Sequence, residues 1–242
     1  MKALLNIAII ALLLTGCTRS SGTAPSTVTT APYAVTINPA DFVAVVDNPY
    51  FPLLPGSASI YEAKKKEGLA RVESTVLRET KVVMGIKAVV VHVRALLDGQ
   101  LIEENYDWYA QDKQGTVWYL GEDVNNYEGG KFKDKAGSWE GGVAGALPGI
   151  IMYGNPAAHL GGSYRQEYRK GHAEDVADLL SVTETVTTPY GSFSNVVKTL
   201  DYSTLDLKLR EHKYYAKGFG EVKIVDLVSG EELVALVKFT AP

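Results

Sequence analysis

Apolar and polar side chains alternate in short runs along most of the chain, and this period is typical of β-strands. In residues 103–123, two runs rich in aromatic and β-branched residues flank Asp112-Lys113-Gln114-Gly115. A polar link that ends in glycine predicts a hairpin turn, and Asp98-Gly99 is a second such signal. Strand-like runs cover residues 57–63, 70–78, 88–95, 101–111, 116–120, 163–169, 181–187, 193–203, 207–216, 221–228 and 232–239. The pattern predicts an all-β, mainly antiparallel fold.

One segment has helical spacing instead. In residues 173–180 the apolar side chains Ala173, Val176, Ala177 and Leu180 would share one face of a helix. We therefore expect at most one short helix in the domain.

The strand-like runs form two sets that resemble each other at an offset of 106 residues. Val90-Val91 then correspond to Val196-Val197, and Trp108-Tyr109 correspond to Tyr214-Tyr215. The matches keep their order without a gap, which indicates an internal duplication. We expect two pseudo-repeated meanders, about residues 54–120 and 160–239, that form an open half-barrel or a sandwich within a single β domain spanning residues 35–242.

A glycine-rich insertion, residues 121–159, separates the two predicted meanders. Its segment 139–153 is apolar and too short to cross a bilayer, and Pro148 blocks a long regular helix. Left in water it would expose a large apolar patch. We expect it to fold back over the face of the sheet that bears Trp108 or Trp118, either as a mobile lid or as a fixed plug.

Both faces of the predicted central hairpin carry apolar side chains. An antiparallel sheet with one face in water alternates more cleanly. Either both faces are core, covered by the proline-rich segment 48–56 and by the insertion, or one face lines an apolar cleft for a ligand. The candidate ligand-binding residues of the cleft are Tyr106, Trp108, Trp118, Trp139, Leu147, Ile150, Ile151 and Met152.

The first 17 residues have the features of a secretory signal: Lys2, then an apolar run from Ala3 to Leu14. Leu14-Thr15-Gly16-Cys17 resembles the lipobox of bacterial lipoproteins, and Cys17 is the only cysteine. The resemblance implies that Cys17 is lipidated and anchors the chain in a membrane. Residues 18–34 are rich in Ser, Thr, Ala and Pro and predict a flexible tether. Thr18 after the cysteine resembles the sorting signal for the outer membrane, facing the periplasm, more than that for the inner membrane.

Composition and motifs exclude several classes of function. The net charge of −4 with scattered Lys and Arg indicates no nucleic-acid partner. No motif of a hydrolase, a zinc protease or a nucleotide-binding loop is present, so no catalytic residue and no cofactor are predicted. Oxygen ligands at Glu122, Asp123, Asn125 and Glu128 match the chemistry of Ca²⁺, although polar turns are often only solvated. Arg165 and Glu167 should share a strand face and form an ion pair if that face is covered.

Four motifs resemble a widespread set of bacterial secreted proteins and lipoproteins of no established activity. They are N-P-Y-F-P-L-x-P-G at residues 48–56, D-W-Y-A-Q-D-x-x-G-x-V-W-Y-x-G-E at 107–122, P-Y-G-S-F at 189–193 and K-Y-Y-A-x-G-x-G-x-V at 213–222. The resemblance implies no catalytic residues. The strand number and the lipid anchor are also similar to periplasmic carriers of the LolA/LolB kind, which are open half-barrels with an apolar concave face.

These observations predict a lipid-anchored, non-catalytic protein of the cell envelope that binds an apolar or amphipathic ligand, such as a lipid, in a β-cleft. The alternative is a structural or interaction lipoprotein of an envelope assembly that binds no small molecule. Its protein partner cannot be identified from the sequence.

Overall fold

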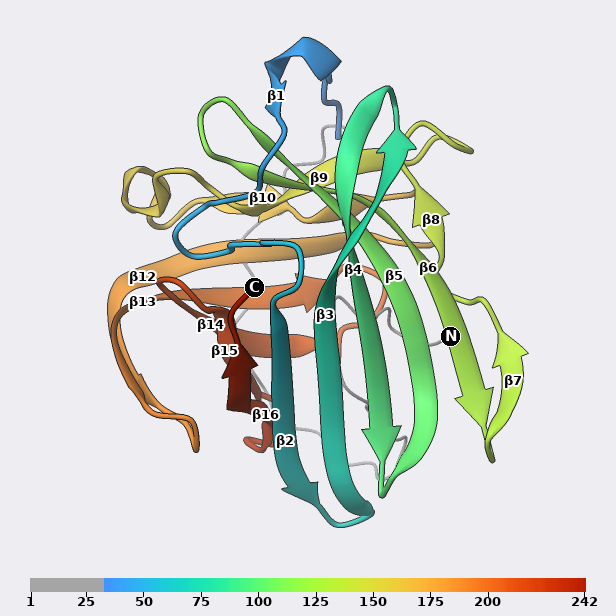
Figure 1. Cartoon of the computed structure of the whole chain (residues 1–242), viewed down its shortest axis with the longest axis vertical. Helices are drawn as coiled ribbons and strands as arrows, with labels where there is room; N and C mark the ends of the chain where they lie inside the picture. Colours follow the sequence, from blue (N-terminus) through green and yellow to red (C-terminus); the bar gives the residue numbers. More distant parts are fainter. Residues whose placement is uncertain (1–32) are drawn as a thin grey trace.

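The structure is a computed structural model and describes residues 33–242. The predicted signal, Cys17 and residues 18–32 of the tether lie outside the described residues. The fold is all-β, as predicted: one sheet of sixteen strands curls until it is nearly closed as a barrel (Figure 1). Its elements are η1 (Pro39–Asp41), β1 (Phe42–Val43), β2 (Ala58–Lys65), β3 (Gly68–Val83), β4 (Ile86–Leu97), β5 (Gln100–Asp112), β6 (Val117–Glu128), β7 (Lys131–Asp134), β8 (Trp139–Glu140), β9 (Leu147–Met152), η2 (Pro156–His159), β10 (Ser163–Arg165), β11 (Glu167–Tyr168), β12 (Asp175–Thr187), β13 (Ser192–Ser203), β14 (Arg210–Ala216), β15 (Gly220–Asp226) and β16 (Glu232–Thr240).

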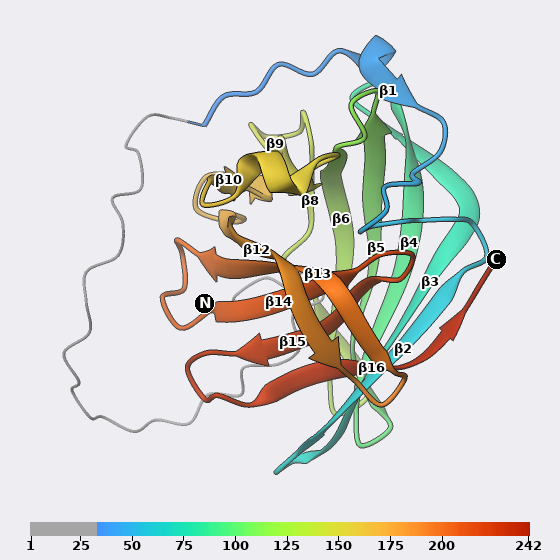
Figure 2. The ribbon, with the colours of Figure 1, turned by 90° about the vertical axis from the view of Figure 1, so that its left-hand side faces the viewer.

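Two antiparallel meanders make up most of the sheet. β2 to β6 form the first, β12 to β16 form the second, and β16 pairs with β2 to join them. Figure 2 shows the strands of the second meander crossing those of the first at a steep angle. The inner faces of the two meanders therefore face each other and enclose the main core.

A six-residue segment closes the sheet between its two ends. β10 pairs with β12 and β11 pairs with β9, while only Gln166 lies between β10 and β11. We call residues 163–168 the closing segment. Because a single stretch of chain bonds to both ends of the strand order, the sheet has almost no free edge.

Two elements differ from the prediction. The segment 173–180 forms no helix: it lies at the start of strand β12, which pairs with β10 and β13. A run this short fits both periods, and pairing on two sides decides for the strand. The apolar segment 139–153 likewise does not lie across a face of the sheet. Its residues form β8 and β9, which extend the sheet beside β6.

Both faces of the first meander are packed. The inner face contributes to the main core, with Val91, Tyr119 and Ile151 among its members. A second core on the outer face contains Val90, Trp108 and Leu120, covered in part by Ile37 and Phe42 from the N-terminal side. The structure thus has apolar residues packed on both faces, which explains why the sequence does not alternate cleanly.

The proline-rich segment 48–56 closes one end of the barrel. The side chain of Asn48 donates hydrogen bonds to the carbonyl oxygens of Gly115 (2.8 Å) and Tyr153 (3.1 Å). Phe51 is buried and contacts the rings of Tyr109 and Tyr215, with ring centroids 5.3 and 6.2 Å apart. The segment therefore joins the two meanders through residues at equivalent positions.

One strand of each meander has matching bounds at the predicted offset. β4 and β13 are related at both ends by the offset of 106 residues, and β3 overlaps β12 at the same offset. The hairpin registers differ, since Val90 lies opposite Trp108 whereas Lys198, and not Val196, lies opposite Tyr214. Superposition of the two halves stays a prediction. Within residues 33–242, no helix has the length and apolar character needed to span a membrane.

Candidate functional site

The interior of the barrel contains an unusual concentration of acidic side chains. Seven carboxylic acids are buried: Asp107, Glu122, Glu167, Asp175, Asp201, Glu211 and Glu221. Lys213 is the one buried basic side chain among the described residues. Burying unpaired charge in a protein interior is costly, so these acids must be paired, protonated or matched by a ligand.

Lys213 holds one part of this cluster. Its ammonium nitrogen lies 3.2 Å from Oδ2 of Asp201, which also accepts a hydrogen bond from Nε2 of Gln166 at 3.0 Å. Burial alone would lower the pKa of Lys213, but the charges of Asp201, Glu211 and Glu221 raise it above its ordinary value. This part of the interior is a structural network built around Lys213, in which Oε1 of Glu221 is the atom left without a hydrogen-bond partner.

The other part consists of Asp107, Glu122 and Glu167, which we call the acid triad. Asp107 and Glu122 are direct cross-strand neighbours on β5 and β6, and Glu167 comes from the closing segment. Asp107 accepts hydrogen bonds through Oδ1 from Tyr119 (3.2 Å) and from Asn105 (3.3 Å). Oδ2 of Asp107 and all four carboxyl oxygens of Glu122 and Glu167 have no hydrogen-bond partner. Five carboxyl oxygens therefore have no partner of good hydrogen-bond geometry, although the hydroxyl of Tyr119 beside Glu122 and the indole NH of Trp139 beside Glu167 act to lower the pKa of these two acids.

A β-bulge turns Glu122 into the barrel. Tyr119 lies opposite Tyr109 and Gly121 lies opposite Trp108, so Leu120 has no partner and the alternation shifts by one residue. Gly121 permits this geometry, since its φ is 142° and a Cβ atom would lie 2.5 Å from the carbonyl oxygen of Trp139. Glu122 therefore faces inward, with 1% of its surface exposed.

Desolvation keeps protons on the acid triad. Burial raises the pKa of Asp107 to about 7, although the hydrogen bonds from Tyr119 and Asn105 act in the opposite direction. Burial also raises the pKa of Glu122 well above its ordinary value, and the charges of Asp107 and Glu167 raise it further. Burial and the charge of Asp175 raise the pKa of Glu167 well above its ordinary value, although the indole NH of Trp139 and the charge of Lys213 act in the opposite direction. The triad is therefore largely neutral near pH 7 when nothing else balances its charge.

Glu122 lines a groove of about 340 Å³ that is open to the outside. The groove also includes Trp108, Trp139 and the exposed loop residues Val143 and Ala144. The ring of Trp139 packs edge-on against Tyr119, with centroids 5.2 Å apart. A volume of this size lies within the range of about 300–1,000 Å³ found for small-molecule sites.

Two cations also line the groove, and both have partners within the protein. The ammonium nitrogen of Lys81 lies 3.5 Å from the ring centroid of Trp108 and 2.8 Å from Oε2 of Glu140. Arg169 donates a hydrogen bond to the carbonyl oxygen of Ser138 at 3.2 Å. Neither cation therefore supplies a donor to Glu122, whose oxygens have no partner.

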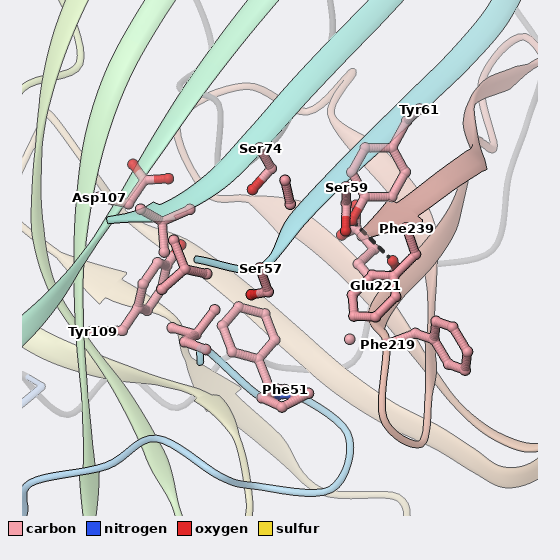
Figure 3. A pocket seen from close by; sticks show the side chains of 16 residues that line it. Phe51, Ser57, Ser59, Tyr61, Ser74, Asp107, Tyr109, Phe219, Glu221 and Phe239 are labelled. Atoms are coloured by element: carbon pink, nitrogen blue, oxygen red, sulfur yellow. Dashed lines mark hydrogen bonds between the residues drawn. The ribbon is translucent and has the colours of Figure 1, made fainter. Parts of the chain in front are cut away.

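A smaller cavity of about 50 Å³ lies on the other side of Asp107, behind the proline-rich segment. Figure 3 shows Asp107 and Tyr109 on one side of this cavity, Tyr61 and Glu221 on the other, and Phe51 between them. Tyr61 donates a hydrogen bond to the carbonyl oxygen of Glu221 at 3.1 Å. The space is sufficient for a few water molecules and too small for a lipid chain.

The predicted ligand-binding residues do not line one common cavity. Trp108 and Trp139 meet at the groove. Tyr106 packs on the outer core and stacks on His92, and Trp118 donates a hydrogen bond to Asp112 at 2.9 Å. Ile151 and Met152 are buried in the main core, Ile150 packs against it, and Leu147 is half-buried in β9.

The four residues proposed as Ca²⁺ ligands are also separated, because neighbours on a strand face opposite sides. Glu122 points inward, while Asp123 pairs with Lys135 and Glu128 pairs with Lys133. Asn125 lies on the same strand and is half-buried. In the part of the chain that the structure describes, no three His, Cys, Asp or Glu side chains meet in a metal-binding arrangement.

The predicted pair of Arg165 and Glu167 is wrong. Arg165 donates a hydrogen bond to the carbonyl oxygen of Glu174 at 2.9 Å, whereas Glu167 is buried without a hydrogen-bond partner. The regular alternation ends at Gln166, where the closing segment passes from β10 to β11. The acid triad was therefore not predicted as a unit. Its one sequence signal was a lone acid, Asp107, between the aromatic residues Tyr106 and Trp108.

Comparison of the chain with protein-family models, with curated proteins and with solved structures found no match.

Proposed function

We propose that the protein is a lipid-anchored, non-catalytic component of the cell envelope that binds an amphipathic molecule in the groove beside Trp108 and Trp139. The observation that carries this proposal is the composition of the groove. The exposed side chains of Val143 and Ala144 and the edges of two largely buried indole rings line it, and the buried carboxyl group of Glu122 lies at the same site without a partner. A small-molecule site typically combines apolar walls with a few polar groups in this way.

The anchor and the location are part of the same proposal. The lipobox at Cys17 and the resemblance to secreted lipoproteins support attachment to the outer membrane, on the side that faces the periplasm. Loss of palmitate labelling in Cys17→Ser tests the anchor. Such a tether would hold the groove close to a lipid surface, where amphipathic ligands are concentrated.

A pair of exposed valines gives a matched test of the groove. We expect Val143→Asp to weaken binding of the apolar fluorescent probe N-phenylnaphthylamine about tenfold, because it places a charge on the apolar rim. Val228→Asp should leave binding unchanged, since Val228 has a similar exposure (61% against 55%) on a different loop. Fluorescence titration of the full chain in nanodiscs, corrected for probe taken up by empty nanodiscs, measures both. Equal loss in the two variants, or no binding to either, would contradict the groove as the site.

The alternative is an interaction protein without a small ligand. The tight packing of Ile151 and Met152 and the small size of the interior cavity favour it, because the barrel encloses no large empty space. Mass spectrometry of small molecules that co-purify with the protein separates the two. A ligand present in stoichiometric amount supports the groove, and its absence together with a failed probe titration supports the alternative.

A further inference from the structure

We infer that the polar end of the ligand is a compact cation, a primary ammonium or a guanidinium group, and that the acid triad of Asp107, Glu122 and Glu167 receives it. This inference rests on the proposed function of the groove and names the chemistry of its ligand. It follows from the open acceptors: five buried carboxyl oxygens have no hydrogen-bond partner. Buried polar groups are normally satisfied, and once these carboxyl groups ionise they match a ligand group that donates several hydrogen bonds.

The positive charge of the ligand's polar end follows from the carboxyl groups that the protein presents. A carboxylate only accepts hydrogen bonds, and an ammonium or guanidinium group offers three or five donors with no acceptor. The protein's own cations are engaged elsewhere: Lys81 with Glu140, Arg169 with Ser138 and Lys213 with Asp201. An anionic head group would keep the triad protonated, because it favours no ionised carboxylate, and would gain only Lys81 and Arg169 at the rim.

The groove gives such a ligand a defined orientation. Glu122 is the member of the triad that lines the groove, and Asp107 is its direct cross-strand neighbour. The apolar part of the ligand would lie along Trp108, Trp139 and Val143, towards the outside. The loop that contributes Val143 and Ala144 to the groove is a series of short turns, closed by the hydrogen bonds Val143 N to Glu140 O (3.0 Å) and Gly142 N to Ala146 O (2.9 Å). Because the carboxyl oxygens of Glu122 are inaccessible, ligand entry would require this loop to shift.

Binding of a cation must release protons from the triad. Without a bound cation the triad holds its protons, because the carboxyl groups are desolvated and their ionised forms would repel one another. A bound ammonium group favours the ionised carboxylates, so protons leave for the solvent as the ligand enters. Affinity should therefore increase with pH between about 6 and 8, where the carboxyl groups become easier to ionise.

Three molecules with the same six-carbon chain test the inference: hexylammonium, 1-hexanol and hexanoate. Binding to the full chain in nanodiscs is measured by tryptophan fluorescence, with empty nanodiscs as the reference for partition into lipid. We expect hexylammonium to bind at least tenfold more tightly than 1-hexanol, and hexanoate to bind most weakly. Calorimetry in two buffers of different ionisation enthalpy should show proton release with hexylammonium alone.

Two variants of equal size isolate the residue responsible. Glu122→Gln should remove the preference for hexylammonium and the proton release while leaving 1-hexanol unaffected. Glu211→Gln is the control, because this buried acid also has a raised pKa but faces Lys213 and lies outside the groove. Asp107→Asn provides a second variant if Glu122→Gln does not fold.

The outcomes separate the inference from the function on which it rests. If all three molecules bind equally, or hexanoate binds best, the cationic ligand is refuted and the groove stands. A hexylammonium preference that persists in a folded Glu122→Gln or Asp107→Asn variant also refutes the triad as its receptor. If none of the three binds, the proposed function itself fails.

Discussion

At the scale of single residues, the orientation of one carboxyl group depends on one glycine. Gly121 allows the bulge in β6, and the bulge turns Glu122 from the outer to the inner face. Gly121 has a φ of 142°, and backbone atoms of Trp139 and Glu140 occupy the position that a Cβ atom would take. No other residue type fits this position without strain. The chemistry of the acid triad therefore depends on a residue that carries no functional group.

We predict that Gly121→Ala destabilises the protein by about 2–4 kcal/mol, since the new methyl group clashes with the backbone and φ is strained. Gly129→Ala is the matched control, because Gly129 also has a positive φ of 58° but nothing lies within 4 Å of its Cβ position. Chemical unfolding of both variants measures the difference. If Gly121→Ala were as stable as Gly129→Ala, the prediction would be wrong, and the backbone at Trp139 would shift at little cost to make room for the methyl group.

At the scale of elements, the proline-rich segment 48–56 and the closing segment 163–168 complete the barrel without being long strands. The first seals one end through Asn48 and Phe51. The second joins β9 to β12 and brings Glu167 into the interior. Both were visible in the sequence, but their roles depend on partners that are distant along the chain.

We predict that Gln166→Ala loosens the closing segment and costs about 1–3 kcal/mol, because Asp201 then loses a buried donor. Hydrogen exchange of the backbone amides of residues 163–168 should become faster in this variant. Lys170→Ala, on the exposed loop that follows, serves as the control. Unchanged exchange in Gln166→Ala would show that strand pairing alone holds the segment.

At the scale of the whole molecule, the buried acids determine how stability depends on pH. Burial raises the pKa of Asp175 to about 6, of Asp107 and Glu211 to about 7, and of Glu221 to about 8. The unfolded chain releases these protons near pH 4, so between pH 4 and 8 the folded protein binds more protons than the unfolded chain. Stability must therefore decrease as pH increases through this window.

We predict that the free energy of unfolding is larger at pH 5 than at pH 8, which is the reverse of common acid denaturation. Urea titrations at pH 5, 6, 7 and 8 measure it. Glu221→Gln should flatten the dependence, because a group that cannot ionise adds nothing to it. A stability that increases from pH 5 to pH 8 would contradict the protonated interior. A bound cation should reduce the loss at high pH, since it stabilises the ionised carboxylates.

The sequence by itself determined the fold class, the hairpin turns at Asp98-Gly99 and at residues 112–115, and the presence of apolar residues on both faces of the central strands. These features depend on side-chain alternation and turn residues, which act over a few positions. The bounds of β4 and β13 are also related by the offset of 106 residues, while the internal duplication itself stays a prediction.

Only the tertiary structure decided which acids meet. Glu122 was assigned to a polar turn because the strand was ended at residue 120, before the bulge at Gly121. Glu167 was paired with Arg165 because alternation was continued through the break at Gln166. In the same way, residues 173–180 and 147–152 adopt strand conformation because they pair with neighbouring strands. A shift of one residue reverses the face of every side chain that follows, and the shift is set by pairing between distant segments. The interior site therefore exists only once the sheet has closed.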